Sequence, residues 1–172
     1  MGRHRFHGDP ERFQVIADFV AERYWREVRY VADVAGGQGM LARILAKQYR
    51  YEAEVIDPRA WVLRGVKHQA SAFDPAFATY YDLIIGLHPD GALREVAQAA
   101  LLRPAIVVPC CNFWSEAKLG QAELIDQIEQ YYALHGVQYE RVEFPFKGPK
   151  NIGLVSAPPQ PRAAGRTGEA NP

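Results

Sequence analysis

The sequence is poor in cysteine, carries no net charge and has no long apolar run. Two cysteines cannot support a disulfide-rich scaffold, and no Cys/His spacing supplies the four ligands of a structural zinc site, so we expect no metal. No apolar run approaches the ~20 residues that span a bilayer. Residues 1–7 are basic but lack the apolar stretch of a secretory signal. We therefore expect a cytoplasmic protein without a membrane partner.

The charge balance and the cysteine positions further narrow the classes of protein that the sequence fits. Lys and Arg together number 20, as do Asp and Glu, whereas a dedicated nucleic-acid binder usually has a basic excess. Cys110 and Cys111 are adjacent, and an unstrained disulfide needs Cα atoms farther apart than one peptide step. We interpret both as free thiols in a reducing compartment.

The chain length fits one domain. At 172 residues there is room for one core and little room for a second. Apolar residues make up 48% and charged residues 23%, as in ordinary globular proteins. We predict a flexible N-terminus over residues 1–8, a folded domain over 9–156 and a disordered tail over 157–172.

Strand and helix patterns alternate along this domain, which predicts an α/β fold with a mostly parallel sheet. Asp9 is the expected N-cap of the first helix. Helices are expected over residues 10–26, 40–49, 92–102 and 115–135. Strands are expected over residues 30–34, 53–56, within 66–73, 81–87, 105–108, 137–144 and 151–156. No helix fits between the last two strands, so the seven-stranded Rossmann-like sheet should end in an antiparallel pair.

A glycine-rich turn follows the first strand, at the carboxyl end where ligands bind in such sheets. Its glycines would let the backbone approach a ligand closely at a helix N-terminus. The spacing Gly37-x-Gly39-x-x-Ala42 also fits a dinucleotide-binding turn, and a tight turn without a ligand is a further alternative. Asp33 favours S-adenosylmethionine (SAM), because a carboxylate there can meet the ammonium of its methionine part. The run is Asp33-Val34-Ala35-Gly36-Gly37-Gln38-Gly39.

Two later positions fit a nucleoside. Asp57 ends the second strand, where an acid can bind ribose hydroxyls of SAM or NAD alike, or simply form a turn before Pro58. Phe73 and Asp74 fall where an adenine would be contacted, although Phe73 is equally well explained as a core residue.

The loop after the fourth strand is expected to line the side of the site that faces the acceptor of the methyl group. His88 is a candidate general base, since its ordinary pKa is near ~6.5, with a purely structural role as the alternative. Asp90 is the expected N-cap of the next helix on this side of the site.

A second candidate acceptor loop follows the fifth strand and contains Pro109, Cys110, Cys111 and Asn112. A cysteine here could act as a nucleophile, as in RNA 5-methylcytosine enzymes. Nothing basic flanks either cysteine in the sequence to lower a thiol pKa. We therefore interpret the two cysteines as small residues that shape the wall of a pocket.

Together these features resemble class I SAM-dependent methyltransferases over residues 9–156. The pairing of Leu87-His88-Pro89-Asp90-Gly91 with Pro109-Cys110-Cys111 resembles a methyltransferase-like group, some members of which methylate ribose hydroxyls in tRNA. The stretch Phe146-Lys147-Gly148-Pro149-Lys150-Asn151 resembles the Gly-x-x-Asn stretch of that group. The resemblance implies SAM contacts from Asp33, Gly37, Gly39 and Asp57, with His88 and the cysteine pair facing the acceptor.

The expected function is methyl transfer from SAM to an unidentified acceptor, with RNA as one candidate. The RNA-modifying relatives carry extra domains, often zinc-binding, and we expect none in these 172 residues. One alternative is therefore a SAM-binding module that works with a partner protein, or as a homodimer. A small NAD-binding oxidoreductase is a second alternative, disfavoured by Asp33.

Overall fold

A computed structural model describes residues 8–59, 61–111, 114–117 and 119–160. The predicted flexible N-terminus, apart from Gly8, and most of the predicted tail lie outside these residues, as does Asn112. The strands are β1 (Tyr30–Val34), β2 (Glu52–Ile56), β3 (Lys67–Gln69), β4 (Leu83–Leu87), β5 (Ala105–Val108), β6 (Gln138–Glu143) and β7 (Ile152–Ala157). The α-helices are α1 (Arg12–Tyr24), α2 (Met40–Tyr49), α3 (Leu93–Ala99) and α4 (Gln121–Leu134), and the 3-10 helices are η1 (Pro75–Tyr80) and η2 (Asp90–Ala92).

The strands form one sheet in the order β3-β2-β1-β4-β5-β7-β6. The first five in this order pair in parallel, and β7 pairs antiparallel with both β5 and β6. From β1 the chain runs outward to β3 and then returns to β4, so the strand order reverses between β1 and β4. The predicted seven-stranded α/β sheet with a C-terminal antiparallel pair is confirmed for the described residues.

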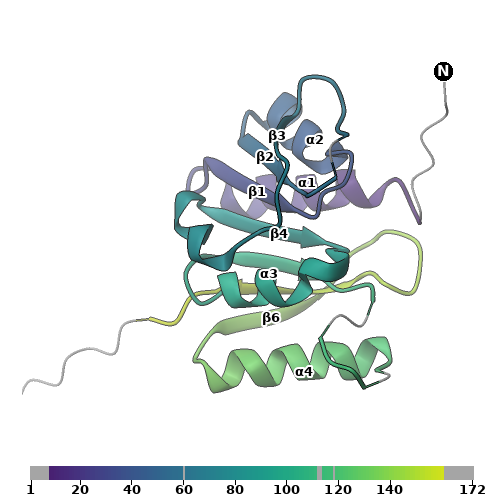
Figure 1. Cartoon of the computed structure of the whole chain (residues 1–172), viewed down its shortest axis with the longest axis vertical. Coiled ribbons are helices and arrows are strands. Elements are labelled where there is room, and N and C mark those ends of the chain that lie inside the picture. The colour runs from purple at the N-terminus through teal and green to yellow at the C-terminus, as the bar shows by residue number, and fades with distance from the viewer. Residues whose placement is uncertain (1–7, 60, 112–113, 118, 161–172) are drawn as a thin grey trace, which may run out of the picture.

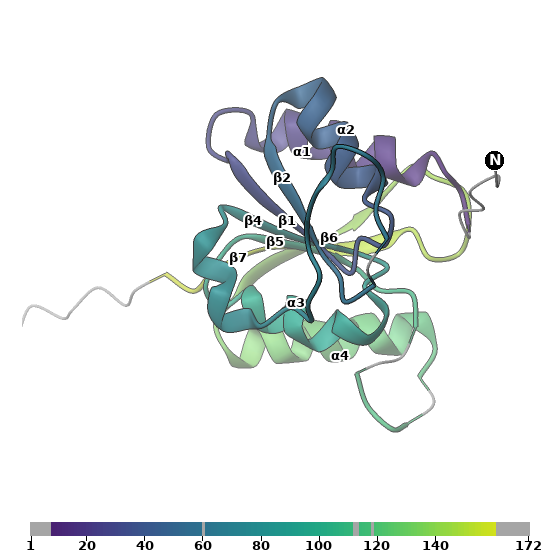
Figure 2. The same ribbon diagram turned by 45° about the horizontal axis from the view of Figure 1, so that its top comes forward.

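Helices cover both faces of the sheet, with α1 and α2 on one side and α3 and α4 on the other (Figure 1, Figure 2). Because neighbouring strand residues point to opposite faces, β4 supplies both cores. Leu83 and Ile85 pack in the α1/α2 core, and Ile84 packs in the α3/α4 core. Strands buried on both faces explain the uninterrupted apolar run of β4.

Three helix starts differ from their predictions. Asp90 is the first residue of η2 and does not cap α3, whose N-cap is Ala92. The N-cap of α1 is Glu11, and Asp9 instead accepts a hydrogen bond from the Glu11 N–H at 3.0 Å in the preceding turn. Helix α4 begins at Gln121, because the Glu123 carboxylate folds back to accept the Gly120 N–H at 2.8 Å. In the described part of the chain, no helix is both long enough and apolar enough to span a membrane.

Leu83 and Leu134 give a matched test of the core. Leu83 is 0% exposed in β4, whereas Leu134 is 82% exposed at the end of α4. Leu83→Ala should lower the free energy of unfolding by about 2–5 kcal/mol, because it removes buried methyl groups and leaves a cavity. Leu134→Ala should change it by less than about 0.5 kcal/mol. Urea denaturation of both variants measures the difference, and equal effects would contradict the fold.

Candidate functional site

An open cleft of about 620 Å³ lies at the carboxyl ends of β1 and β4, where the strand order reverses. This is the position at which open α/β sheets bind ligands. The predicted residues that line it are Asp33, Ala35, Gly36, Gly37, His88, Asp90, Cys110 and Cys111. The predicted residues Gly39, Asp57, Phe73, Asp74 and Pro109 do not line it directly.

The glycine-rich turn forms the floor of the cleft. A Cβ added to Gly36 would lie 2.5 Å from the Asp33 carboxyl carbon, so only glycine fits against this acid. Gly39 adopts a left-handed φ of 79°, and a Cβ there would lie 2.7 Å from Val55. The tight turn therefore requires glycine at both positions, and Gly39 shapes the turn without lining the cleft itself.

Asp33 is buried under this turn. Its side chain accepts a hydrogen bond from the Ala42 N–H at 3.2 Å, in the first turn of α2, and the residue is 1% exposed. Burial raises the pKa of Asp33 to about 7, and the nearby Asp57 carboxylate acts in the same direction. The bond from Ala42 opposes this rise without cancelling it.

Asp57 lies at the end of β2, but Arg59 covers it. Its two oxygens accept bonds from Arg59 Nε at 2.8 Å and Arg59 Nη2 at 2.7 Å, and Oδ2 also accepts the Gly37 N–H at 2.9 Å. Burial alone would raise the pKa of Asp57, yet these hydrogen bonds hold it below its ordinary value. Arg59 was not assigned to the site from the sequence, although Asp57-Pro58-Arg59 places both charges in one turn.

The two residues expected near an adenine have other positions. Phe73 is buried in the α3/α4 core, which matches the alternative of a core residue. Asp74 caps η1, where its side chain accepts the Ala76 N–H at 2.9 Å. Neither side chain borders the cleft.

The turn after β4 holds His88 in the cleft wall. His88 and Asp90 both have positive φ values, 56° and 36°, a conformation that is uncommon outside glycine and often occurs at functional sites. His88 Nε2 lies 2.9 Å from the Lys150 carbonyl oxygen, so Nε2 carries the proton and Nδ1 keeps its lone pair. Burial lowers the pKa of His88 and outweighs that hydrogen bond, and the cations Arg12 and Lys150 lower it further.

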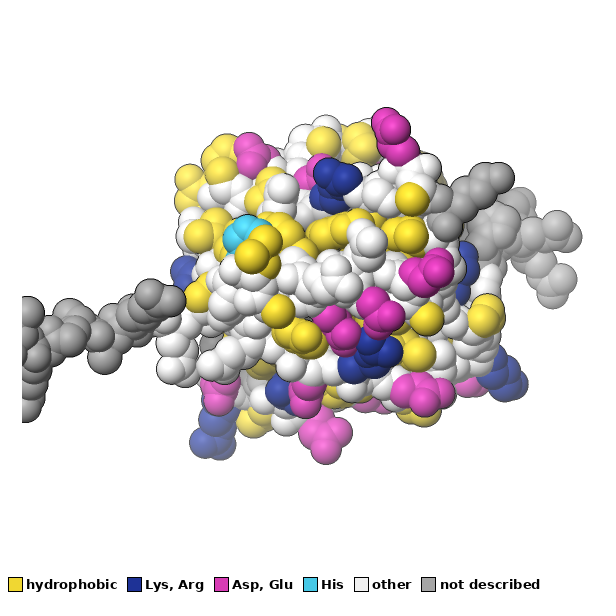
Figure 3. Space-filling view, turned by 90° about the horizontal axis from the view of Figure 1, so that it is seen from below, with side chains coloured by type: hydrophobic (Ala, Val, Ile, Leu, Met, Phe, Trp, Pro, Cys, Tyr) yellow, Lys and Arg dark blue, Asp and Glu magenta, His cyan; other side chains and the backbone are white. Residues whose placement is uncertain are grey.

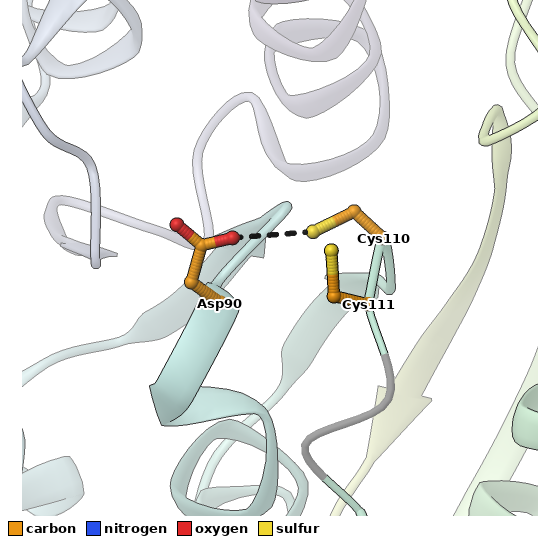
Figure 4. A group of neighbouring side chains, drawn as sticks. All are labelled: Asp90, Cys110 and Cys111. Atoms are coloured by element: carbon orange, nitrogen blue, oxygen red, sulfur yellow. Dashed lines mark hydrogen bonds between the residues drawn. The ribbon is translucent and has the colours of Figure 1, made fainter. Parts of the chain in front are cut away.

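Asp90 and the two cysteines converge across the ends of β4 and β5 (Figure 4). The Cys110 thiol donates to Asp90 Oδ1 at 3.4 Å, and both cysteines are free. Burial raises the pKa of Cys110 to about 12, with Cys111 and Asp90 adding to the effect. This pKa argues against a Cys110 nucleophile. The three ligand atoms lie within 4.8 Å of one another, so this donor set could hold a zinc-like ion.

Besides Arg59, three further cations line the cleft, of which Lys147 and Lys150 belong to the stretch after Phe146 that the sequence singled out and Arg12 does not. Arg12 opens α1, and Lys147 and Lys150 lie in the loop between β6 and β7. Lys150 Nζ lies 3.8 Å from Cys111 Sγ, so a basic group does flank the cysteine pair, contrary to the sequence-based expectation. Arg12 is far from the glycine turn in sequence, and no local pattern marks it.

Arg141, a basic residue outside the cleft, is paired. Arg141 on β6 bonds Asp126 and Glu129 of α4, at 2.7 and 2.8 Å. On the face seen in Figure 3, acidic side chains lie beside the basic ones and no broad basic patch is visible. Arg141 therefore offers no free charge to a polyanion in this arrangement.

No protein-family model matches the chain, and no curated protein matches it significantly. Among solved structures, it is similar to a ribosomal protein L11 methylase from Lactobacillus delbrueckii subsp. bulgaricus, with a TM-score of 0.56 and 18% identity over 87% of this chain and 80% of that one. A SAM-dependent methyltransferase from Aquifex aeolicus gives 0.56 and 16% over 87% and 93%. A candidate hemolysin from Streptococcus thermophilus gives 0.59 and 9% over 92% and 71%.

These similarities establish the fold. The chain has the Rossmann-like fold found in SAM-dependent methyltransferases, as the sequence predicted. Identities of 9–18% carry no residue roles from those proteins to this one. The similarity to tRNA ribose methyltransferases stays a prediction.

The raised pKa of Asp33 predicts a pH effect on stability. The folded protein holds this proton up to about pH 7, whereas the unfolded chain releases it near pH 3.8. Stability from this group is complete below about pH 4 and falls as the pH rises to about 7. The Asp33→Asn variant lacks this loss, and Asn can still accept the Ala42 N–H.

Urea denaturation of both proteins between pH 4 and pH 8, without ligand, measures the effect. The difference in unfolding free energy should move in favour of Asp33→Asn up to about pH 7 and then level off. Two parallel stability curves would show that Asp33 has an ordinary pKa.

Proposed function

We propose that this protein is a SAM-dependent methyltransferase. The observation that carries the proposal is the buried Asp33 beneath a glycine turn, at the point where the strand order reverses. This combination gives a cleft in which an acid lies beside a tight glycine turn at the start of α2, which suits a ligand with both an ammonium and a carboxylate. The fold shared with SAM-dependent methyltransferases supports the same function.

In this proposal Asp33 binds the methionine ammonium of SAM and the glycine turn approaches its carboxylate. Asp57 accepts the ribose hydroxyls after Arg59 moves off it, because both Asp57 oxygens are occupied in the structure. Phe73 and Asp74 take no part in this proposal, since Phe73 packs in the α3/α4 core and Asp74 caps η1.

His88 is the proposed general base. SAM supplies a methyl group on a positively charged sulfur, so transfer needs mainly an aligned acceptor. The acceptor lone pair attacks the methyl carbon, the carbon–sulfur bond breaks, and S-adenosylhomocysteine leaves. A neutral His88 whose Nε2–H donates to the Lys150 carbonyl oxygen can take the acceptor's proton at Nδ1.

Binding of S-adenosylhomocysteine tests the cofactor. Calorimetry should show binding of this compound and none of NAD. Because an ionised Asp33 is needed to pair with the ammonium, affinity should rise from pH 5.5 to pH 7.5, through the Asp33 pKa of about 7.

The Asp33→Asn variant should bind at least about tenfold more weakly at pH 7.5 and lose this pH dependence. Asp126→Asn is the matched control, because Asp126 lies on the surface of α4 and pairs with Arg141. Undetectable binding to the wild type, or an Asp33→Asn affinity equal to that of the wild type, would refute the SAM site.

His88→Ala separates cofactor binding from acceptor chemistry. Affinity for S-adenosylhomocysteine should match that of the wild type, because His88 lies on the far wall with Lys150 and Phe146. Methyl transfer to any acceptor found by screening should fall at least about a hundredfold, the usual contribution of a positioned base. Full activity in His88→Ala would leave only a structural role.

RNA stays among the proposed acceptors. Lys147 and Lys150 line the cleft and could meet phosphates, whereas Arg141 is held by two carboxylates of α4.

A further inference from the structure

We infer that the acceptor end of the cleft contains a subsite for an anionic oxygen group, a carboxylate or a phosphate, held by Arg12 and Lys150. That the group belongs to the methyl acceptor rests on the proposed function. That the subsite binds an anion does not, because it follows from the side chains alone.

Arg12 is the first observation. It is the first residue of α1, lines the cleft and is only 8% exposed. Its Nη1 donates to the Asp9 carbonyl at 2.9 Å and its Cζ lies 4.3 Å from the centre of the Phe13 ring. Its Nε is buried without a hydrogen-bond partner.

No carboxylate within the described residues forms an ion pair with Arg12. A buried guanidinium without a counter-ion is costly, and buried charges are ordinarily paired. The nearest acid in this corner is Asp9, whose oxygens accept the N–H groups of Glu11 at 3.0 Å and Lys147 at 2.7 Å. The Asp9 oxygens thus hold the backbone, and Asp9 acts on Arg12 only through its electrostatic field and not through an ion pair, so the Arg12 guanidinium can still bind an anionic ligand directly.

The surroundings of Arg12 add positive charge. The N-terminus of α1 opens on the cleft without a side-chain cap, and its backbone dipole favours an anion. The Asp9–Lys147 bond ties the β6–β7 loop to the start of α1, which brings Lys150 to the same end of the cleft. Lys150 Nζ points at the cysteine pair rather than at a carboxylate.

The subsite adjoins the proposed base. The Lys150 carbonyl accepts from His88 Nε2, and the electrostatic effects of both Arg12 and Lys150 reach His88. An acceptor anchored here by a carboxylate or phosphate would therefore have its reacting atom near His88. Alignment of this kind is the main contribution that methyl transfer from SAM requires.

Two simple anions test the subsite. Inorganic phosphate and acetate are each titrated into the wild-type protein at constant ionic strength, with chloride as the replaced ion. Thermal shift and heteronuclear NMR give the apparent Kd. We expect at least one of the two to bind with saturation and to shift resonances of α1 and of the 147–150 loop.

Variants assign the binding to Arg12. Arg12→Met keeps the packing on Phe13 and should lower the affinity for the anion at least about tenfold, the loss expected for one charge-assisted hydrogen bond. Arg12→Lys should recover part of the affinity. Arg23→Met is the matched control on the same helix, because Arg23 is paired with Glu140 on the surface and should leave binding unchanged.

Lys150→Met provides a second test if Arg12→Met fails to fold, and it should also weaken binding. Tighter binding of phosphate supports a phosphate-bearing acceptor, including RNA, and tighter binding of acetate supports a carboxylic acid. Absence of saturable binding, or binding that neither variant alters, would overturn the subsite. Binding of S-adenosylhomocysteine, measured in parallel, shows independently whether the SAM site stands.

Discussion

The contact between the Asp33 carboxylate and Gly36 is the constraint on which the site depends. The acid is buried at the end of β1, and the turn passes so close over it that a single methyl group at Gly36 would overlap the carboxyl carbon. The same carboxylate receives the Ala42 N–H and so fixes the start of α2. Strand end, turn and helix start are therefore one unit. Its cost is a buried acid with a raised pKa, which a bound ammonium would offset.

The charged groups of the cleft come from different parts of the chain. The glycine-turn side contributes Asp33 and Arg59, and the acceptor side contributes Asp90 together with Asp9, Arg12, Lys147 and Lys150 from the start of α1 and the β6–β7 loop, so cations outnumber acids on the acceptor side. A side chain that takes no part in the proposed chemistry holds the acceptor side together: Asp9 joins the turn before α1 to Lys147. A ligand with a cationic end and an acceptor with an anionic end would each meet a complementary surface.

The sequence predicted the fold and the glycine turn well because both depend on local patterns. Alternating apolar runs and the Asp33–Gly39 spacing are readable without knowledge of distant contacts. Arg12 and Arg59 were not assigned to the cleft, because their positions depend on how α1 and the turn after β2 pack beside the glycine turn. Phe73 shows a limit of the opposite kind. An aromatic residue after β3 can pack in the core or line a pocket, and only the tertiary packing shows which of the two occurs.

Arg59 and Asp57 show how the unliganded site satisfies its own charges. Asp57 is buried and would be costly as an isolated carboxylate, so it accepts two bonds from the Arg59 side chain, whose own surface is 62% exposed. Ribose hydroxyls could replace those bonds, and Arg59 could then return to solvent at little cost because it is already half hydrated. The net gain from Asp57 would be smaller than its hydrogen bonds suggest, since one set of partners is exchanged for another. Within the described residues no cation covers Asp33 in this way, and for this reason we expect it to contribute more to cofactor binding than Asp57.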